Sequence, residues 1–242
     1  MKLVFIGTSH GVPEKDRRCS SCLLEVGGSY YIIDMGTQTI EDLRRREIAI
    51  ENVRLVICTH PHGDHTDGIV SFVDLLNWYF KQAKTKILLP DARLIPPLKT
   101  WAEACENGRP MRKDLQLCSF SAGVAYEDEH LRITAIPTQH CENSYALLVE
   151  PEGKKLLFTG DLCRPDVDFP SVAFETELDL IVCELAHFSP ESCVAAFDRT
   201  KAKRVLHTHI NESRWGDSLS AQLSLPHAYE YGAAYDGMEL VL

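Results

Sequence analysis

Histidine and aspartate side chains crowd into one short stretch, THPHGDHTDG, from Thr59 to Gly68. It carries His60, His62, Asp64 and His65 directly after the apolar run RLVIC. Imidazole nitrogens and carboxylate oxygens are common ligands of zinc and related ions. In an extended or turning segment His60 and His62 project to the same side, so they can bind one ion while Asp64 and His65 turn toward a second. This stretch alone leaves a polar turn as the alternative.

Three further candidates occur at comparable places in the chain. His140 follows LRITAIPT, Asp161 follows KKLLFTG, and His209 follows KRVLHT. Each comes just beyond the carboxyl end of a predicted strand, which is where α/β sheets place their ligands. Together with the four residues of the first stretch, they predict a dinuclear metal site.

The elements that must position these residues are predicted from apolar runs bounded by turn residues. Strands are expected at Leu3 to Ile6, Tyr30 to Met35, Leu55 to Cys58, Ile87 to Leu89, Leu131 to Ile136, Tyr145 to Val149, Leu156 to Thr159, Leu180 to Cys183, Val205 to Leu206 and Met238 to Leu242. Helices are expected at about Gln38 to Arg46, Gly68 to Gln82, Leu94 to Glu106 and Ser189 to Lys201. The alternation predicts an α/β fold. The least regular segment, Pro90 to Gly123, is interpreted as a helical insertion or loop that shapes substrate access, or as a surface connection without a role.

The composition limits the classes of function. The chain has 242 residues, of which 45% are hydrophobic, and no segment resembles an interdomain linker, so we expect one domain over residues 1–242. A net charge of -10 disfavours long-range attraction of nucleic acid or anionic membranes. The apolar run Leu3 to Ile6 is too short for a signal peptide or a membrane span, so we expect a cytoplasmic protein with no membrane partner. We expect the nine cysteines to be reduced, with Cys58 and Cys183 in the core.

The ordered motifs resemble those of the metallo-β-lactamase superfamily. The resemblance lies in THPHGDHTDG, the isolated His140, TGD at 159–161 and HTHI at 207–210. The segments KLVFIGTSHGVP, YYIIDMGTQT and RITAIPTQHCENSYALLVE are similar to the ribonuclease Z-like branch. The resemblance covers most of the chain, is weakest from about Pro90 to Gly123, and implies a four-layer αββα sandwich.

The resemblance also implies which residues bind metal. His60, His62 and His140 would hold one ion, Asp64, His65 and His209 the other, and Asp161 would bridge them. The ligand types suit two divalent ions, with Zn²⁺ preferred and Mn²⁺ or Fe as alternatives. A water shared by two such ions ionises near neutral pH and would be the nucleophile, oriented by a hydrogen bond to Asp64.

Two assignments leave alternatives open. The family pattern of Thr-His followed by an apolar residue favours His209 over His207 as the last ligand, with His207 as a neighbour. His187, in CELAHFSPES, matches a histidine that is thought to protonate the leaving group in ribonuclease Z-like proteins, and Glu184 could hold its ring; a helix-capping role is the alternative. An acidic residue expected shortly before the bridging aspartate is missing.

Six other positions are lesser candidates. Asp34 resembles an aspartate that braces the metal-binding loop, and His10 could touch substrate or lie on a surface loop. Cys19 and Cys22 form a CxxC without a second one, so they are interpreted as loop or core thiols, with a redox or extra-metal role as the lesser reading. Cys163 is close enough in sequence to Asp161 to face the metals or to pack. Asp67 is expected at the start of the following helix.

The leading hypothesis for function is a dinuclear metal-dependent hydrolase, a phosphodiesterase that attacks a small phosphodiester with a metal-bridging hydroxide. Ribonuclease Z activity on tRNA is an alternative, but the acidic charge disfavours a nucleic-acid partner, and only 20 residues separate His140 from Asp161, with no room for the tRNA-gripping arm of that family. A lactonase, a thioesterase and a non-catalytic metal-binding module are further alternatives. The resemblance makes a homodimer a fair expectation.

Overall fold

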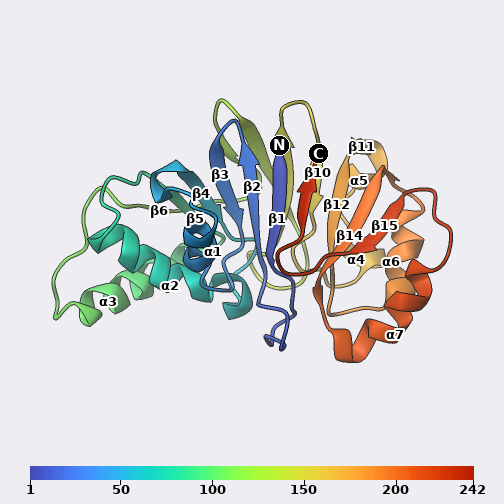
Figure 1. Ribbon diagram of the computed structural model, residues 1–242, viewed down its shortest axis with the longest axis horizontal. Helices are drawn as coiled ribbons and strands as arrows, with labels where there is room; N and C mark the ends of the chain where they lie inside the picture. The colour runs from blue at the N-terminus through green and yellow to red at the C-terminus, as the bar shows by residue number, and fades with distance from the viewer.

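Two seven-stranded β-sheets lie face to face in the computed structural model, which describes residues 1–242 (Figure 1). The first sheet has the strand order β16-β1-β2-β3-β4-β5-β6. Its strands are β1 (Lys2–Gly7), β2 (Ser21–Val26), β3 (Ser29–Ile33), β4 (Val53–Ile57), β5 (Lys86–Leu89), β6 (Gln116–Ser119) and β16 (Glu239–Val241). Strands β3 to β6 run parallel to one another, so their carboxyl ends share one edge.

The second sheet has the order β15-β14-β12-β10-β9-β8-β7. Its strands are β7 (Gly123–Glu127), β8 (Leu131–Pro137), β9 (Tyr145–Pro151), β10 (Leu156–Phe158), β12 (Leu180–Leu185), β14 (Arg204–Ile210) and β15 (Glu230–Ala233). Strands β10, β12, β14 and β15 are parallel, and β8 runs in the same direction because β9 is antiparallel to both β8 and β10. A separate parallel pair joins β11 (Glu177–Leu178) and β13 (Lys201–Ala202).

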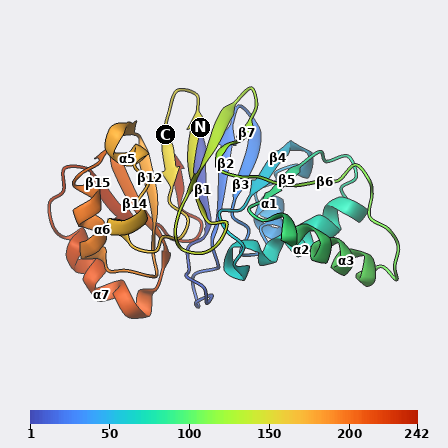
Figure 2. The ribbon, with the colours of Figure 1, turned by 180° about the vertical axis from the view of Figure 1, so that it is seen from behind.

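Helices cover the outer face of each sheet (Figures 1 and 2). On the first sheet these are α1 (Ile40–Arg45), α2 (Gly63–Trp78) and α3 (Ile95–Cys105), with short 3-10 turns η1 (Ile50–Asn52) and η2 (Ala92–Leu94). On the second sheet these are α4 (Pro165–Asp168), α5 (Val172–Glu175), α6 (Pro190–Phe197) and α7 (Glu212–Leu223). No helix is both long enough and apolar enough to cross a membrane.

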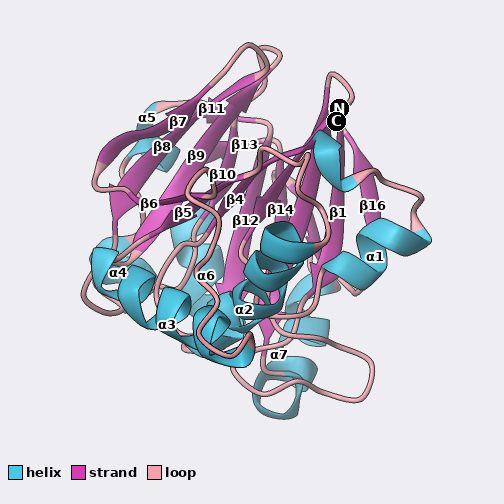
Figure 3. Cartoon of the chain, turned by 90° about the vertical axis from the view of Figure 1, so that its left-hand side faces the viewer, coloured by secondary structure: helices cyan, strands magenta, loops and turns pink.

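Three buried clusters separate these layers, because alternate side chains of each strand face opposite sides. In β1, Leu3 and Phe5 face the cluster between the two sheets, whereas Val4 and Ile6 face α1 and α2. In β12, Val182 faces the inner cluster, whereas Ile181 and Cys183 face α6. The layers are therefore helix, sheet, sheet and helix, which follow one another from left to right in Figure 1. Figure 3 views the same layers from the helix-covered side of the first sheet.

The expected α/β class and four-layer αββα sandwich are confirmed, but several element boundaries differ. Helix α2 begins at Gly63, five residues before the expected start, so Asp67 lies inside it and His62 is its N-cap. A polar first turn is tolerated because its N–H groups need no partners within the helix, and Asp64 favours the positive end of the helix dipole. Helix α6 ends at Phe197, four residues before the expected end.

Several elements were not expected from the sequence. Strands β2, β6, β7 and β15 and helix α7 were missed, because their apolar residues are too few or too irregular to show a period. Segment 90–123 contains α3, as expected, but also β6, which pairs with β5 and completes the first sheet.

Candidate metal centre

Three imidazoles converge where the parallel strands of the two sheets end. The Nε2 atom of His60 is 3.1 Å from Nδ1 of His62, and Nε2 of His140 is also 3.1 Å from that atom. Burial, with the neighbouring His65, holds the pKa of His60 well below its ordinary value, and burial also lowers the pKa of His140. Neutral rings have lone pairs to offer, and nitrogens bound to one zinc ion lie about 3.3 Å apart, so this trio has the spacing of a ligand set.

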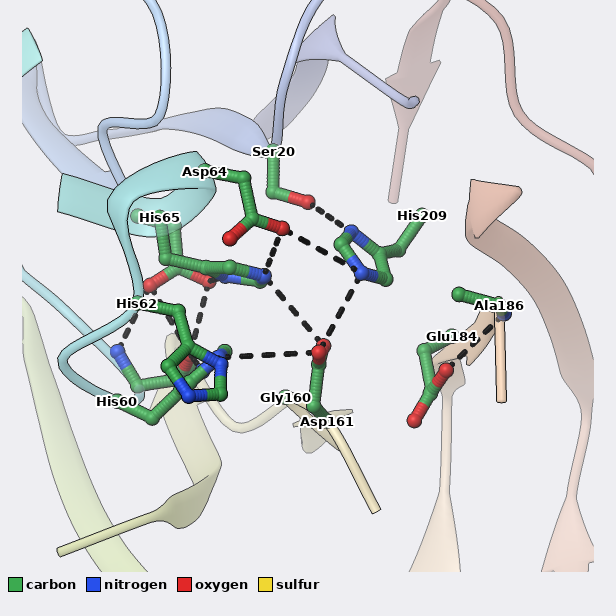
Figure 4. Close-up of polar contacts among 12 residues, drawn as sticks. Ser20, His60, His62, Asp64, His65, Gly160, Asp161, Glu184, Ala186 and His209 are labelled. Atoms are coloured by element: carbon green, nitrogen blue, oxygen red, sulfur yellow. Dashed lines mark hydrogen bonds and ion pairs between the residues drawn. The ribbon is translucent and has the colours of Figure 1, made fainter. Parts of the chain in front are cut away.

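A second set lies beside the first (Figure 4). Asp64 Oδ2 is 3.5 Å from His65 Nε2 and 3.7 Å from His209 Nε2. Asp161 contacts both sets: its Oδ2 is 3.3 Å from His209 Nε2, 3.7 Å from His60 Nε2 and 3.6 Å from His140 Nε2. Its Oδ1 is 3.4 Å from His65 Nε2. The seven residues expected to bind metal therefore form two adjacent clusters with Asp161 between them.

Two buried atoms in this centre lack hydrogen-bond partners, namely His65 Nε2 and Asp161 Oδ1. A buried polar atom without a partner is costly, and native proteins rarely leave one so. The carboxylates of Asp34 and Asp161 overcome burial and raise the pKa of His65 to about 10, while His209 and His65 hold the pKa of Asp161 well below its usual range. The centre thus combines carboxylate charge with buried nitrogen and oxygen atoms that have no hydrogen-bond partner. A divalent cation would coordinate such atoms.

Hydrogen bonds fix which nitrogen of each buried imidazole faces the centre. The Thr59 hydroxyl donates to Asp34, so it accepts from Nδ1 of His60 at 3.1 Å, and His60 Nε2 is left with its lone pair. Asp34 also accepts from Nδ1 of His65 at 2.9 Å. Orienting contacts of this kind set the tautomer of metal-binding histidines. Asp34, which is buried at the end of β3, thus braces the loop as its sequence context suggested.

His187 lies at the open side of the same centre. Its Nδ1 is 2.8 Å from Oε2 of Glu184 and 3.8 Å from Oδ2 of Asp161, while its side chain is 39% exposed. The hydrogen bond that the His187 ring donates to the Glu184 carboxylate raises the pKa of His187, so the ring is doubly protonated in a larger fraction of molecules at neutral pH. Because Nδ1 is held by Glu184, the opposite nitrogen, Nε2, is the one free to exchange a proton with a bound molecule.

Comparison with known families decides where the chain belongs. Residues 1–223 match the family described as "Anti-Pycsar protein Apyc1". The chain belongs to this family.

Curated relatives of this Apyc1 family member include ribonucleases Z. The chain is 30% identical to a ribonuclease Z of Pseudomonas putida over 142 residues, which are 58% of this chain and 44% of that protein. It is 29% identical to a ribonuclease Z of an Exiguobacterium species over 167 residues, 68% of this chain and 54% of that protein. The chain thus spans about half the length of the curated relatives it matches.

Solved structures establish the fold. The structure of human tRNase Z, short form, superposes with a TM-score of 0.77 at 17% identity, covering 100% of this chain and 99% of that one. The metallo-β-lactamase fold protein YhfI from Bacillus subtilis also gives a TM-score of 0.77, at 17% identity, with 99% of this chain and 98% of that one covered. A diphosphatase of the PhnP family gives 0.72 at 17% identity, with 100% of this chain and 97% of that one covered. The resemblance to the metallo-β-lactamase superfamily and its ribonuclease Z-like branch is confirmed.

In this Apyc1 family member, His209 and His207 face different sides of the second sheet because the pairing of β12 and β14 is interrupted between them. The register of β12 and β14 shifts so that Glu184 pairs with Thr208 and Leu185 with Ile210, and His209 has a φ of 51°. Its ring turns to the centre, where Ser20 Oγ lies 2.8 Å from Nδ1 (Figure 4). His207 lies instead on the helix-covered face, 2.8 Å from the Tyr231 hydroxyl, and burial lowers its pKa to about 4.

Asp168, on the short helix α4, is a positioning residue that sequence reasoning missed. Its Oδ2 accepts hydrogen bonds from the backbone N–H groups of Gln139 at 2.7 Å and Cys163 at 2.9 Å, and its Oδ1 accepts from Arg164 at 3.0 Å. The side chain is nearly buried, at 8% exposure. It ties the loop that carries His140 to the loop that follows Asp161. No local pattern signals this role, because a DVDF segment is typical of many surface turns.

Glu184 was expected only to hold His187, yet it does more. It is 1% exposed and accepts hydrogen bonds from the backbone N–H groups of Leu162 at 2.7 Å and Ala186 at 3.0 Å. It therefore fixes the residue that follows Asp161 as well as the loop that carries His187. The acidic partner of His187 is therefore Glu184, at the end of β12. The segment before Asp161, where an acidic partner was expected, is occupied by Leu156, Leu157 and Phe158.

Close backbone packing sets the first turn of α2 against the loop after β3. A Cβ atom added to Gly36 would lie 1.6 Å from the carbonyl oxygen of Asp64, so no other residue fits there without moving that turn. Met35 N donates to the His65 carbonyl oxygen at 2.8 Å, on the same side. The glycine after YYIIDM therefore positions two of the candidate ligands.

The lesser candidates lie outside the ligand clusters. His10 is 3.3 Å from Glu14 on a loop near Asp64. Cys19 and Cys22 are buried free thiols, as are the core residues Cys58 and Cys183, and Cys163 is exposed.

Proposed function

We propose that this chain is a dinuclear metal-dependent phosphodiesterase that hydrolyses a small phosphodiester. The observation that carries the proposal is the pair of ligand clusters that share Asp161, with the unsatisfied His65 Nε2 and Asp161 Oδ1 between them. His60, His62 and His140 would hold one divalent ion, Asp64, His65 and His209 the other. Zn²⁺ is the leading candidate because histidine nitrogens and carboxylate oxygens are ligands it favours, and Mn²⁺ or Fe are alternatives.

Two such ions, when bound, make a water molecule acidic enough to ionise near neutral pH and neutralise charge on a phosphoryl oxygen. The protein's own residues then aim the reaction. Asp64 faces His65 and His209 through its Oδ2 atom. Its Oδ1 atom is then left to accept a hydrogen bond from the attacking water. His187, held by Glu184, donates the Nε2 proton to the departing oxygen, because an alkoxide leaves poorly unless it is protonated.

A small phosphodiester is favoured over tRNA. The segment between His140 and Asp161 is filled by the β9 and β10 hairpin, so it holds no projecting arm. The net charge of -10 also opposes binding of a long polyanion. Ribonuclease Z activity is retained as the second candidate function because the curated relatives carry that name. Lactonase and thioesterase activities use the same kind of centre on a carbonyl group.

The test combines metal analysis with a substrate panel. We expect about two ions per chain, falling on Asp161→Ala, and turnover of an aryl phosphodiester and a cyclic nucleotide by the metal-loaded protein. A precursor tRNA, a lactone and an acylated thiol serve as competing substrates. A folded protein that takes up no ions would refute the mechanism. Metal-loaded protein that cleaves only one of the competing substrates would reassign the reaction to that class.

The cellular setting belongs to the same proposal. We expect a cytoplasmic protein, one domain over residues 1–242, and a homodimer in solution. Cell fractionation, limited proteolysis and light scattering test these three statements.

A further inference from the structure

The ring of His209 depends on contacts from outside its own strand. Its backbone has a φ of 51°, a left-handed conformation that costs free energy in a residue other than glycine, so surrounding contacts must hold it. The N–H of the next residue, Ile210, donates to the carbonyl oxygen of Thr8 at 2.8 Å. Ser20 Oγ lies 2.8 Å from Nδ1 of His209 (Figure 4). Thr8 and Ser20 lie in the first and second halves of the connection between β1 and β2.

The two halves of this connection lie side by side at the end of β14. The N–H of Ser9 donates to the carbonyl oxygen of Arg18 at 2.8 Å. Ser9 also forms isolated bridges with Cys19 on one side and with Ile210 on the other. The first half therefore lies between the second half and β14, so a shift of either half would move a contact that holds His209.

Asp236, in the loop between β15 and β16, binds both halves. Its Oδ1 accepts from the N–H of Thr8 at 2.9 Å and from the Thr8 hydroxyl at 2.8 Å. Its Oδ2 accepts from the N–H of Arg18 at 2.8 Å and from Arg18 Nε at 3.3 Å. The carboxylate side chain is only 14% exposed. The next residue, Gly237, donates its N–H to the carbonyl oxygen of Phe5 at 2.7 Å, which fixes the loop against β1.

We propose that Asp236 is a positioning residue that holds the His209 ring at the second ligand cluster and so raises the affinity of that cluster for a divalent ion. The inference rests on the dinuclear centre of the proposed function. Asp236 itself makes no hydrogen bond or ion pair with any candidate ligand, and it acts through the two halves of the connection. Hydrogen bonds to a carboxylate are stronger than those between neutral groups, so one side chain can hold two backbone segments together. One ion of the pair therefore depends on Asp236, and the other does not.

Metal titration of Asp236→Asn tests this role. Whichever way the amide turns, its NH2 group faces donors that the carboxylate accepted, so one half of the connection loses its acceptor. Residues that orient metal ligands typically change metal affinity by about 10–100-fold. In competition with a chelator, the affinity for one Zn²⁺ ion should fall by about that factor and the affinity for the other should stay within about 2-fold. In a His209→Ala background, which keeps one ion, adding Asp236→Asn should change the remaining affinity by less than about 2-fold.

Asp42→Asn is the matched control. The Asp42 side chain is 13% exposed and pairs with the same Arg18 guanidinium, but it accepts no hydrogen bond from the backbone of the connection. The affinity for both Zn²⁺ ions should therefore stay within about 2-fold of the wild-type values. Urea unfolding of both variants defines conditions under which each is fully folded, and the titrations are made there.

Histidine ring resonances give a readout that needs neither metal nor substrate. In the metal-free protein with isotope-labelled histidine, the ring resonances that disappear in His209→Ala identify this residue. At fixed pH they should shift in Asp236→Asn and stay in place in Asp42→Asn. Unchanged His209 resonances in folded Asp236→Asn would overturn the positioning role, as would an equal loss of affinity for both ions or the same loss with and without His209. Wild-type protein that takes up no ions would instead count against the proposed function, and the ring resonances would still decide whether Asp236 positions His209.

Discussion

Replacing Asp168 should weaken metal binding although this residue contacts neither candidate ligand set. In Asp168→Asn the amide oxygen can still accept from Gln139 and Cys163, but the amide nitrogen then faces the N–H of Arg164, and the negative charge is lost. Hydrogen bonds to a charged group contribute about 1.5–3 kcal/mol each, so the loss of one should lower the free energy of unfolding by about that amount. Asp168→Ala removes both acceptor oxygens and with them all three hydrogen bonds, and it should cost about 3–5 kcal/mol, because the freed N–H groups lie near the surface and regain water in part.

The metal affinity separates a positioning role from a merely structural one. Partners that hold the segments around metal ligands typically affect metal affinity or activity by about 10–100-fold, and Asp168 joins the loops of His140 and Asp161. Dialysis of the loaded protein against a competing chelator, below the unfolding transition, measures this change. Asp166→Asn is the control, since Asp166 lies on the same helix and pairs only with Arg164 at the surface. Equal metal retention in Asp168→Asn and Asp166→Asn would show that the clamp does not position the ligands.

Three further changes probe other parts of the structure. His209→Ala should lose one metal ion, whereas His207→Ala should keep both ions. His207→Ala should lower the free energy of unfolding by about 1–3 kcal/mol, because the Tyr231 hydroxyl loses its partner. Metal analysis and urea unfolding of both variants would reveal the reverse pattern if His207 were the ligand. Glu184→Gln should lower kcat about 100-fold for an alkyl leaving group and less for nitrophenolate. It should also shift the basic limb of the pH profile to lower pH, because Glu184 raises the pKa of His187. An unchanged basic limb would exclude His187 as the acid. Asp128 accepts from the hydroxyls of Tyr31 at 2.8 Å and Tyr126 at 2.9 Å, and these bonds together with backbone N–H groups outweigh burial and lower its pKa. Its contribution to stability is therefore present above the unfolded pKa of about 4 and is lost as the pH falls through the folded value, so Asp128→Asn should cost about 1–2 kcal/mol at pH 7 and less at pH 3 in urea titrations; a cost independent of pH would contradict this reasoning.

His60, His140 and Asp161 could be predicted because each follows a strand in the sequence, whereas His209, which was expected beyond a strand end, lies within β14. His140 and Asp161 come from β8 and β10, whose carboxyl ends meet at one edge of the second sheet, and His60 comes from the end of β4 in the first. The apolar runs of these strands are regular enough to locate the edges. The resemblance to a known superfamily then supplied the pairing of residues between the sheets, which periodicity cannot give.

The residues that orient the ligands could not be predicted in the same way. Ser20 and His209 are 189 positions apart, and Ser20 precedes a strand, β2, that has no clear alternating pattern. Asp168 acts on backbone N–H groups, which every residue except proline carries, so no partner residue type marks it in the sequence. Both contacts are consequences of how the loops fold over the sheet edge.

One irregularity explains why strand periodicity could not distinguish His207 from His209. Two residues apart on a regular strand, they would face the same side of the sheet. The register shift between β12 and β14 leaves His209 as an additional residue between the pairs of Thr208 with Glu184 and Ile210 with Leu185. Bulges commonly redirect side chains next to active sites. Because Glu184 lies at the same shift and holds His187, a single break in pairing positions both a candidate ligand and the candidate proton donor. Restoring regular pairing there, by deleting one residue of the Thr208 to Ile210 segment, would displace His209 and Glu184 together.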